Sequence, residues 1–244
     1  MKPLSILAFI WIFAALNGLR AQPQFITHGK IEFEKRTNQH SMLDEENVWD
    51  EMMKKEFPKF ASTYYDLYFD EHASLYKPGR EPENNKIHWA LNYMSNTVYK
   101  NLDQGTALTQ KSIFGSDYLI SDSLRNVTWK ISSEPRTIAG FECHKALGKV
   151  FDSVIVIAYY TDEIIPSTGP ESFNGLPGMI LGLAIPRMHT TWYATKLELI
   201  DIGAKELVQP KEGKRITGPQ FQEQMKEFLK NNDWLKKMSW QMLI

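Results

Sequence analysis

Short segments of alternating apolar and polar residues, separated by turn-forming residues, are the feature that most restricts how this chain can fold. Ile31 and Phe33 alternate with Glu32 and Glu34, and this period of two returns many times downstream. A period of two is typical of strands, whose side chains point alternately to opposite faces of a sheet. The pattern predicts strands near residues 24–36, 60–69, 75–76, 97–102, 107–114, 117–121, 127–132, 141–150, 153–160, 179–185 and 190–200.

Two segments have helical periodicity instead. Residues 44–57 carry an apolar stripe, with Ser41 or Asp44 as a possible N-cap and Pro58 as the stop signal. Residues 217–230 begin with Thr217 and Gln220 at capping-box spacing. We therefore expect an α+β fold: a mainly antiparallel, strongly curved, half-barrel-like sheet of about eight to eleven strands, with one N-terminal and one C-terminal helix packed on it.

The amino terminus is typical of a secretory signal peptide. Lys2 precedes an apolar run that is too short to cross a bilayer, and Ala21 supplies a small residue at the expected cleavage site. An uncleaved anchor helix is the rival interpretation. We expect residues 1–21 to be removed and residues 22–244 to form a single β-rich domain without a stable membrane span. The lone Cys143 cannot serve as a lipid attachment site after the apolar run, so the expected location is the periplasm or the exterior; we expect this cysteine to be buried.

Composition excludes several classes of protein. Apolar residues make up 43% of the chain and charged residues 23%, as in ordinary globular proteins. The 28 basic and 29 acidic residues give a formal net charge of −1, so no basic excess favours nucleic-acid binding.

One segment resembles the signature of a known family. The run Gly175-Leu176-Pro177-Gly178-Met179-Ile180 is similar to the motif that names the GLPGLI, or Porphyromonas-type, family of exported proteins from Bacteroidota. Three further stretches, 129–131, 138–146 and 169–173, resemble the same family, whereas Tyr159 stands where many members carry Trp. The resemblance implies export and lineage and no assigned reaction.

The same segment supplies the candidate site, which we name the motif loop. Its residues are Gly169, Pro170, Phe173, Gly175, Leu176, Pro177 and Gly178. Pro177 and Gly178 suit a type II turn, in which the glycine adopts a positive φ. The loop could be a rigid buried structural element, or it could line the mouth of an apolar cavity and gate a ligand. Leu and Pro carry no proton chemistry, so a catalytic role is the least favoured.

The sequence contains no recognisable catalytic or metal-binding motif. The adjacent Cys143 and His144 would point to opposite faces of a strand, and Asp162 and Glu163 suit a solvated strand end. We expect no catalytic residues, no metal and no cofactor. Three hypotheses follow: non-enzymatic binding of a hydrophobic ligand in the curved sheet, a protein–protein interaction module of an envelope complex, and a hydrolase or metalloenzyme.

Overall fold

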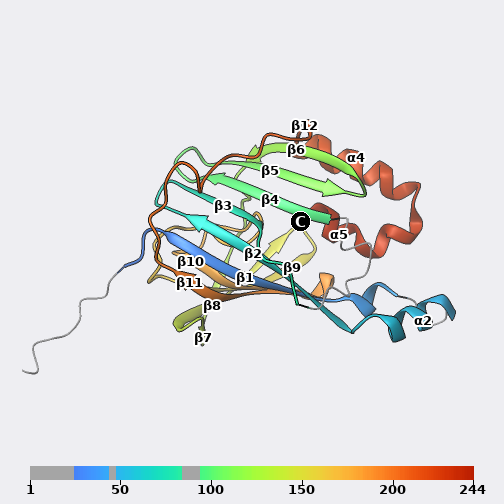
Figure 1. The fold of residues 1–244 in the computed structure, drawn as a ribbon, viewed down its shortest axis with the longest axis horizontal. Helices are drawn as coiled ribbons and strands as arrows, with labels where there is room; N and C mark the ends of the chain where they lie inside the picture. Colours follow the sequence, from blue (N-terminus) through green and yellow to red (C-terminus); the bar gives the residue numbers. More distant parts are fainter. Residues whose placement is uncertain (1–24, 44–47, 84–93) are drawn as a thin grey trace, which may run out of the picture.

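A computed structural model describes residues 25–43, 48–83 and 94–244 of the chain (Figure 1). The expected signal peptide lies outside these residues. Twelve strands form one sheet: β1 Gly29–Asn38, β2 Phe60–Phe69, β3 Ala73–Pro78, β4 Met94–Asn101, β5 Thr106–Ile113, β6 Ser116–Ser123, β7 Lys130–Ile138, β8 Phe141–Val150, β9 Val154–Thr161, β10 Met179–Ile185, β11 Thr190–Glu198 and β12 Lys214–Thr217. Three α-helices, α2 Val48–Glu56, α4 Gly218–Lys230 and α5 Ser239–Leu243, and three short 3₁₀ helices, Gln39–Met42, Pro186–Met188 and Asp233–Met238, complete the described fold.

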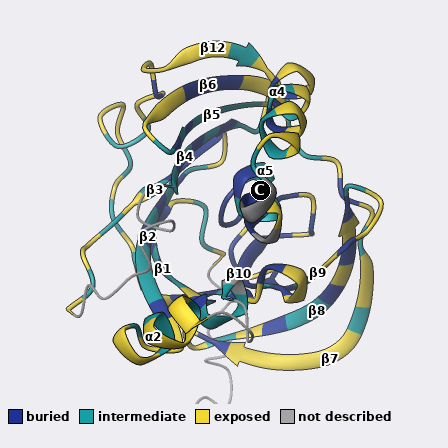
Figure 2. Ribbon diagram, turned by 90° about the vertical axis from the view of Figure 1, so that its right-hand side faces the viewer, coloured by how far each residue is buried: buried dark blue, intermediate teal, exposed yellow. Residues whose placement is uncertain are grey.

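The strand order is β12-β6-β5-β4-β3-β2-β1-β11-β10-β9-β8-β7, with β12 and β7 at its two ends, so the sheet is open. All strand pairs are antiparallel except β12 with β6, which is parallel. β1 pairs with β11, which comes from near the end of the chain, and this pairing joins the two halves of the sheet. Figure 2 shows α5 lying on the inner side of the bend that the strands follow.

Each of the eleven longer strands overlaps a range predicted from the sequence period, several to within a residue or two. β7 is the exception in its bounds, because it spans 130–138 where the sequence predicts 127–132. β8 and β10 have the predicted bounds, and β9 begins one residue after Ser153. The expectation of eight to eleven strands falls one short of the twelve observed. The strand that the sequence did not predict is β12, which contains only four residues, two of them charged. A strand this short carries no alternation that sequence inspection can detect.

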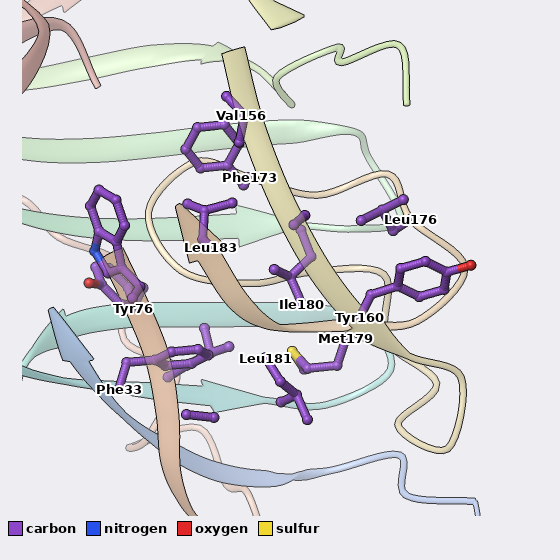
Figure 3. Close-up of a cluster of buried hydrophobic side chains, with 14 of the residues drawn as sticks. Phe33, Tyr76, Val156, Tyr160, Phe173, Leu176, Met179, Ile180, Leu181 and Leu183 are labelled. Carbon is purple, nitrogen blue, oxygen red and sulfur yellow. The ribbon is translucent and has the colours of Figure 1, made fainter. Parts of the chain in front are cut away.

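The inner face of the sheet carries two apolar clusters. The larger joins β1–β4 to β8–β11 and includes Phe33, Trp192 and Leu183, all fully buried (Figure 3). The smaller lies between β5, β6 and the C-terminal helices, where the rings of Tyr118 and Phe221 meet edge to face at 5.3 Å. The two clusters leave a space between them on the inner side of β4–β6.

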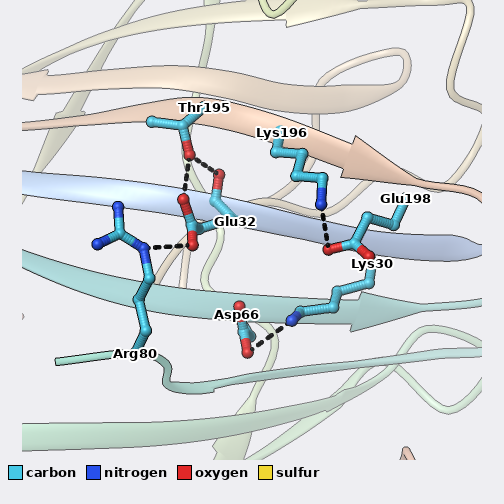
Figure 4. A network of polar contacts seen from close by, with 7 residues as sticks. All are labelled: Lys30, Glu32, Asp66, Arg80, Thr195, Lys196 and Glu198. Atoms are coloured by element: carbon cyan, nitrogen blue, oxygen red, sulfur yellow. Dashed lines mark hydrogen bonds and ion pairs between the residues drawn. The ribbon is translucent and has the colours of Figure 1, made fainter.

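The outer face of the sheet carries a polar network across β1, β2 and β11. On β1, β2 and β11, Lys30 pairs with Asp66 at 3.0 Å, and Glu32 accepts hydrogen bonds from Arg80 at 2.9 Å and Thr195 at 2.7 Å (Figure 4). Partly exposed pairs of this kind contribute little stability each. Their effect is to fix which face of these strands meets water.

The helix predicted over 44–57 exists from Val48, but it does not pack on the sheet. None of its residues is buried, and Val48 and Trp49 are 77% and 73% exposed. The physical reason is topological: α2 connects the neighbouring antiparallel strands β1 and β2, so it leaves the sheet at their ends (Figure 1). Ser41 lies in the 3₁₀ helix Gln39–Met42, where its hydroxyl donates to Asn38 O, and Asp44 lies outside the described residues.

The C-terminal helix begins as predicted. The Thr217 hydroxyl accepts from Gln220 N–H and the Gln220 side chain accepts from Thr217 N–H, which completes the capping box. α4 turns Phe221 and Met225 towards β5 and β6. α5 follows and places Met242 in the smaller cluster and Ile244 in the larger one.

Candidate functional site

The motif loop, between β9 and β10, lies inside the molecule. Phe173 is fully buried and Leu176 is 2% exposed, among residues of both sheet halves (Figure 3). The burial of both apolar side chains agrees with the first of the two alternatives for this loop, a buried structural element. Gly175, by contrast, is exposed and lines a surface hollow.

The turn at Pro177-Gly178 differs from the type II turn expected. Gly178 has the predicted positive φ, 126°. Its N–H, however, donates to the carbonyl of Leu176 at 2.7 Å, a three-residue γ-type turn, because Met179 N–H is already bonded to Ile164 O. A Cβ on Gly178 would collide with the carbonyl oxygen of Thr161, so this position requires glycine for space as well as for conformation.

Lys100, on the inner face of β4, binds the main chain of the motif loop. Its Nζ donates to the carbonyl oxygens of Gly169 and Phe173, each at 2.8 Å, and its side chain is fully buried. Burial lowers the pKa of Lys100 to about 7, against the opposing attraction of Glu171. One lysine thus donates hydrogen bonds to two main-chain carbonyl groups of the buried loop, which would otherwise lack a donor among the described residues.

Glu171 is the second anchor of the loop. It is fully buried and has a φ of 51°, which is strained for a residue with a Cβ. Its carboxylate pairs with Lys35 of β1 at 3.2 Å and accepts from Asn96 of β4 at 2.7 Å. The loop is therefore tied to strands on both sides of β2 and β3.

Aromatic rings surround the Lys35 side of this ion pair. The Lys35 ammonium lies 5.6 Å from the ring centroid of Tyr65 and 5.2 Å from that of Trp192. The rings of Tyr65 and Tyr76 stack at 4.8 Å. Although burial opposes its charge, the carboxylate of Glu171 holds the pKa of Lys35 above its usual value, so this lysine stays protonated.

The interior cavity, as we name it, lies between β4–β6, α4, α5 and the segment after β6. It measures about 250 Å³ and opens to solvent beside the exposed residues Asp122, Ser123 and Asn126. A second pocket beside Lys35 and Asn96 measures about 40 Å³, which has room for little more than water. The interior cavity is walled by apolar side chains and by a few polar ones: Val98, Ala107, Thr109, Lys111, Ile120, Asp122, Ser123, Leu124, Arg125, Asn126, Ser172, Gly218, Phe221, Gln222, Leu243 and Ile244.

None of the seven motif-loop residues named from the sequence lines the interior cavity. Within that loop only Ser172 does, and its Oγ accepts a hydrogen bond of 2.7 Å from Arg125 Nε. The turn residues Gly169, Pro170, Pro177 and Gly178 instead shape the backbone that supports this wall.

Sequence reasoning missed the inward-facing charged residues. Lys100 and Lys111 occupy core positions of β4 and β5, two residues from the buried Val98 and Ile113. A lysine in step with the apolar side of a strand is a signal that could have been noticed. Glu171 carried no such signal, since it lies in a loop whose burial depends on the whole sheet.

The other ionisable residues considered from the sequence do not line the interior cavity. Cys143 is fully buried, as predicted, and His144 is half-buried. Asp162 and Glu163 are exposed at the end of β9, as expected for solvated residues. Over residues 25–43, 48–83 and 94–244, no group of three or more His, Cys, Asp or Glu side chains is placed to hold a metal ion.

A family model described as "Protein of unknown function (Porph_ging)" matches residues 148–182. This stretch covers the end of β8, β9, the motif loop and the beginning of β10. The matched residues are therefore those that build the buried loop and its two flanking strands. No curated protein matches the chain.

Among solved structures, the fold is similar to two crystal forms of PNGF-II. One has a TM-score of 0.54 at 13% identity over 81% of this chain, and the other 0.52 at 13% over 86%. This chain spans about a third, 33%, of the length of either PNGF-II structure. At this identity the likeness concerns the fold alone. In the part of the chain that the structure describes, no helix has the length and hydrophobicity to span a membrane.

Proposed function

We propose that this protein is exported to the cell envelope, periplasmic or secreted, and binds a small ligand with a hydrophobic portion without catalysing a reaction. In this proposal the sheet acts as a half-barrel whose concavity holds the ligand. The observation that carries the proposal is the interior cavity of about 250 Å³, whose apolar wall comes from three different elements: Val98 of β4, Ile120 of β6 and Phe221 of α4. Binding of apolar surface in such a space is favourable without any covalent chemistry.

The amino-terminal sequence supports export, and the matched segment supports assignment to a GLPGLI-type family. The hydroxyl of Ser172 in the cavity wall accepts from Arg125. Among the described residues it has no hydrogen bond to a histidine or a carboxylate, the partner that would activate a nucleophile.

Native mass spectrometry of protein purified from the periplasm tests the proposal. We expect a bound mass in addition to the polypeptide that begins after residue 21. Thr109→Trp places an indole in the cavity and should abolish this mass. Gln110→Trp is the matched control, because the next residue of β5 points to the opposite face.

Circular dichroism of both variants checks that the fold is kept. A bound mass that persists in Thr109→Trp, or a wild-type protein that carries no ligand from any source, would overturn the proposal.

A second candidate, a protein–protein interaction module, is favoured by one observation. α2 exposes Val48, Trp49 and Met52, the last at 57%. In this case chemical cross-linking in intact cells should capture an envelope protein with the wild type and lose it with Val48→Ser/Met52→Ser.

A further inference from the structure

Two cationic side chains and one carboxylate line the interior cavity. Lys111 reaches it from β5 and is 3% exposed, and Arg125 reaches it from the segment after β6. Asp122, at the end of β6, is exposed and lies at the rim. The charges of the cavity are therefore unevenly placed, with the lysine deep and the carboxylate near solvent.

The carboxylate of Asp122 lies at the N-terminus of α4. Its carboxylate lies against Gly218, the first residue of α4, so close that a Cβ at that glycine would collide with it. A helix N-terminus carries a partial positive charge that favours an anion there. Among the described residues, neither Lys111 nor Arg125 has a carboxylate within salt-bridge distance. Asp122 and Glu171 attract Arg125, and Glu171 attracts Lys111, only from farther away.

The contacts of the two cations agree with this reading. In the described part of the chain, Lys111 Nζ donates to the carbonyl of Met242 at 3.1 Å, and neither cation forms a salt bridge. The Arg125 guanidinium lies over the rings of Phe151 and Phe173, at 5.1 and 5.7 Å. A buried cation whose direct contacts are all neutral is costly, and an anion beside it lowers that cost.

We propose that the interior cavity recognises an amphiphile with an anionic head group, carboxylate or phosphate, held between Lys111 and Arg125. The apolar portion lies against Val98, Ile120 and Phe221. This inference rests on the proposed function and names its ligand class. The volume fits a short chain, so eight-carbon compounds are suitable probes.

Isothermal titration calorimetry at pH 7.5 compares octanoate, octyl phosphate, 1-octanol and octylamine. We expect the anions to bind at least tenfold more tightly than 1-octanol, and the amine to bind no more tightly than the alcohol. The order of octanoate and octyl phosphate distinguishes a carboxylate from a phosphate head group. Lys111→Met and Arg125→Gln should each reduce the ratio of octanoate affinity to 1-octanol affinity, both measured with the same variant, at least fivefold. Lys226→Met, on the exposed side of α4, is the control.

Proton uptake supplies a second readout. Burial lowers the pKa of Lys111 to about 7; Glu171 raises this pKa and Lys35 and Arg125 lower it further. A bound anion favours the protonated lysine, so octanoate should take up a fraction of a proton at pH 7.5. This is measured by repeating the titration in buffers of different ionisation enthalpy, and Lys111→Met should lose it. Lys111→Arg keeps a permanent charge, so it should retain the preference without proton uptake.

The outcomes separate the two proposals. Equal binding of octanoate and 1-octanol, or tighter binding of octylamine, overturns the inference and leaves the proposed function standing. Binding of none of the four probes, together with a ligand-free native mass, overturns both.

Discussion

Lys100 Nζ, on the inner face of β4, donates a hydrogen bond of 2.8 Å to the main-chain carbonyl of Phe173 in the motif loop. The same ammonium bonds Gly169 O at the same distance, and the loop's Glu171 pairs with Lys35 of β1. A loop of glycines and prolines is thus fixed in the interior by charged side chains of the sheet. The predictions that follow test this arrangement.

Gly178→Ala should destabilise the protein by about 2–4 kcal/mol, because a methyl group would meet Thr161 O and because φ is 126°. Gly115→Ala is the matched control: its φ is also positive, at 81°, but nothing lies within 4 Å of the added Cβ. It should cost about 1–2 kcal/mol from conformation alone. Urea unfolding measures both, and equal losses would show that the close approach is unimportant.

Glu171→Gln should destabilise by about 3 kcal/mol, because it leaves the Lys35 ammonium without its buried carboxylate. The comparison is Glu198→Gln, which removes the exposed partner of Lys196 at 3.4 Å (Figure 4) and should change stability by less than about 0.5 kcal/mol. Replacing both members, in Lys35→Met/Glu171→Met, should recover part of the loss. A Glu171→Gln protein as stable as the wild type would contradict the anchoring role.

Stability should rise between pH 7 and pH 8.5. Burial lowers the pKa values of Lys100 and Lys111 to about 7, from an ordinary value of 10.5. Above pH 7 the unfolded chain binds more protons at these lysines than the folded one, so each adds up to about 1.4 kcal/mol per pH unit. Cys143 acts in the opposite sense only above about pH 9, since burial raises the pKa of its thiol to about 11.

The measurement is urea unfolding at several pH values within this window. Lys100→Met should lower the slope of stability against pH by one lysine's contribution, whereas the exposed Lys226→Met should not alter it. A wild-type stability that is flat or falls from pH 7 to 8.5 would contradict the low pKa values.

Cys143 should resist thiol reagents in the native protein. The side chain is fully buried, and this burial raises the pKa of the thiol and keeps it protonated. Its Sγ donates to Phe141 O at 3.6 Å. Ellman's reagent should label it slowly at pH 8 and completely in 8 M urea. Rapid labelling without denaturant would mean that β8 opens readily.

The strands were predictable because a period of two is a local property. A strand with one face in the core has alternating apolar and polar residues in its sequence. In β1, Ile31 and Phe33 alternate with Glu32 and Glu34. The capping box at Thr217 and Gln220 is equally local. The need for a positive φ at Gly178 followed from its neighbour Pro177 and from the residue type alone.

The sequence by itself therefore determined eleven of the twelve strands, the helix α4 with its cap, and most of their bounds. It left open whether the motif loop is a buried structural element or lines a cavity. Only the tertiary structure decided that α2 stands away from the sheet, that Glu171 meets Lys35, and that Lys111 and Arg125 share a cavity with Phe221. These relations join residues up to 136 positions apart. They depend on how β1 pairs with β11 and how the C-terminal helices enter the bend of the sheet, and no local pattern of side chains encodes such a pairing.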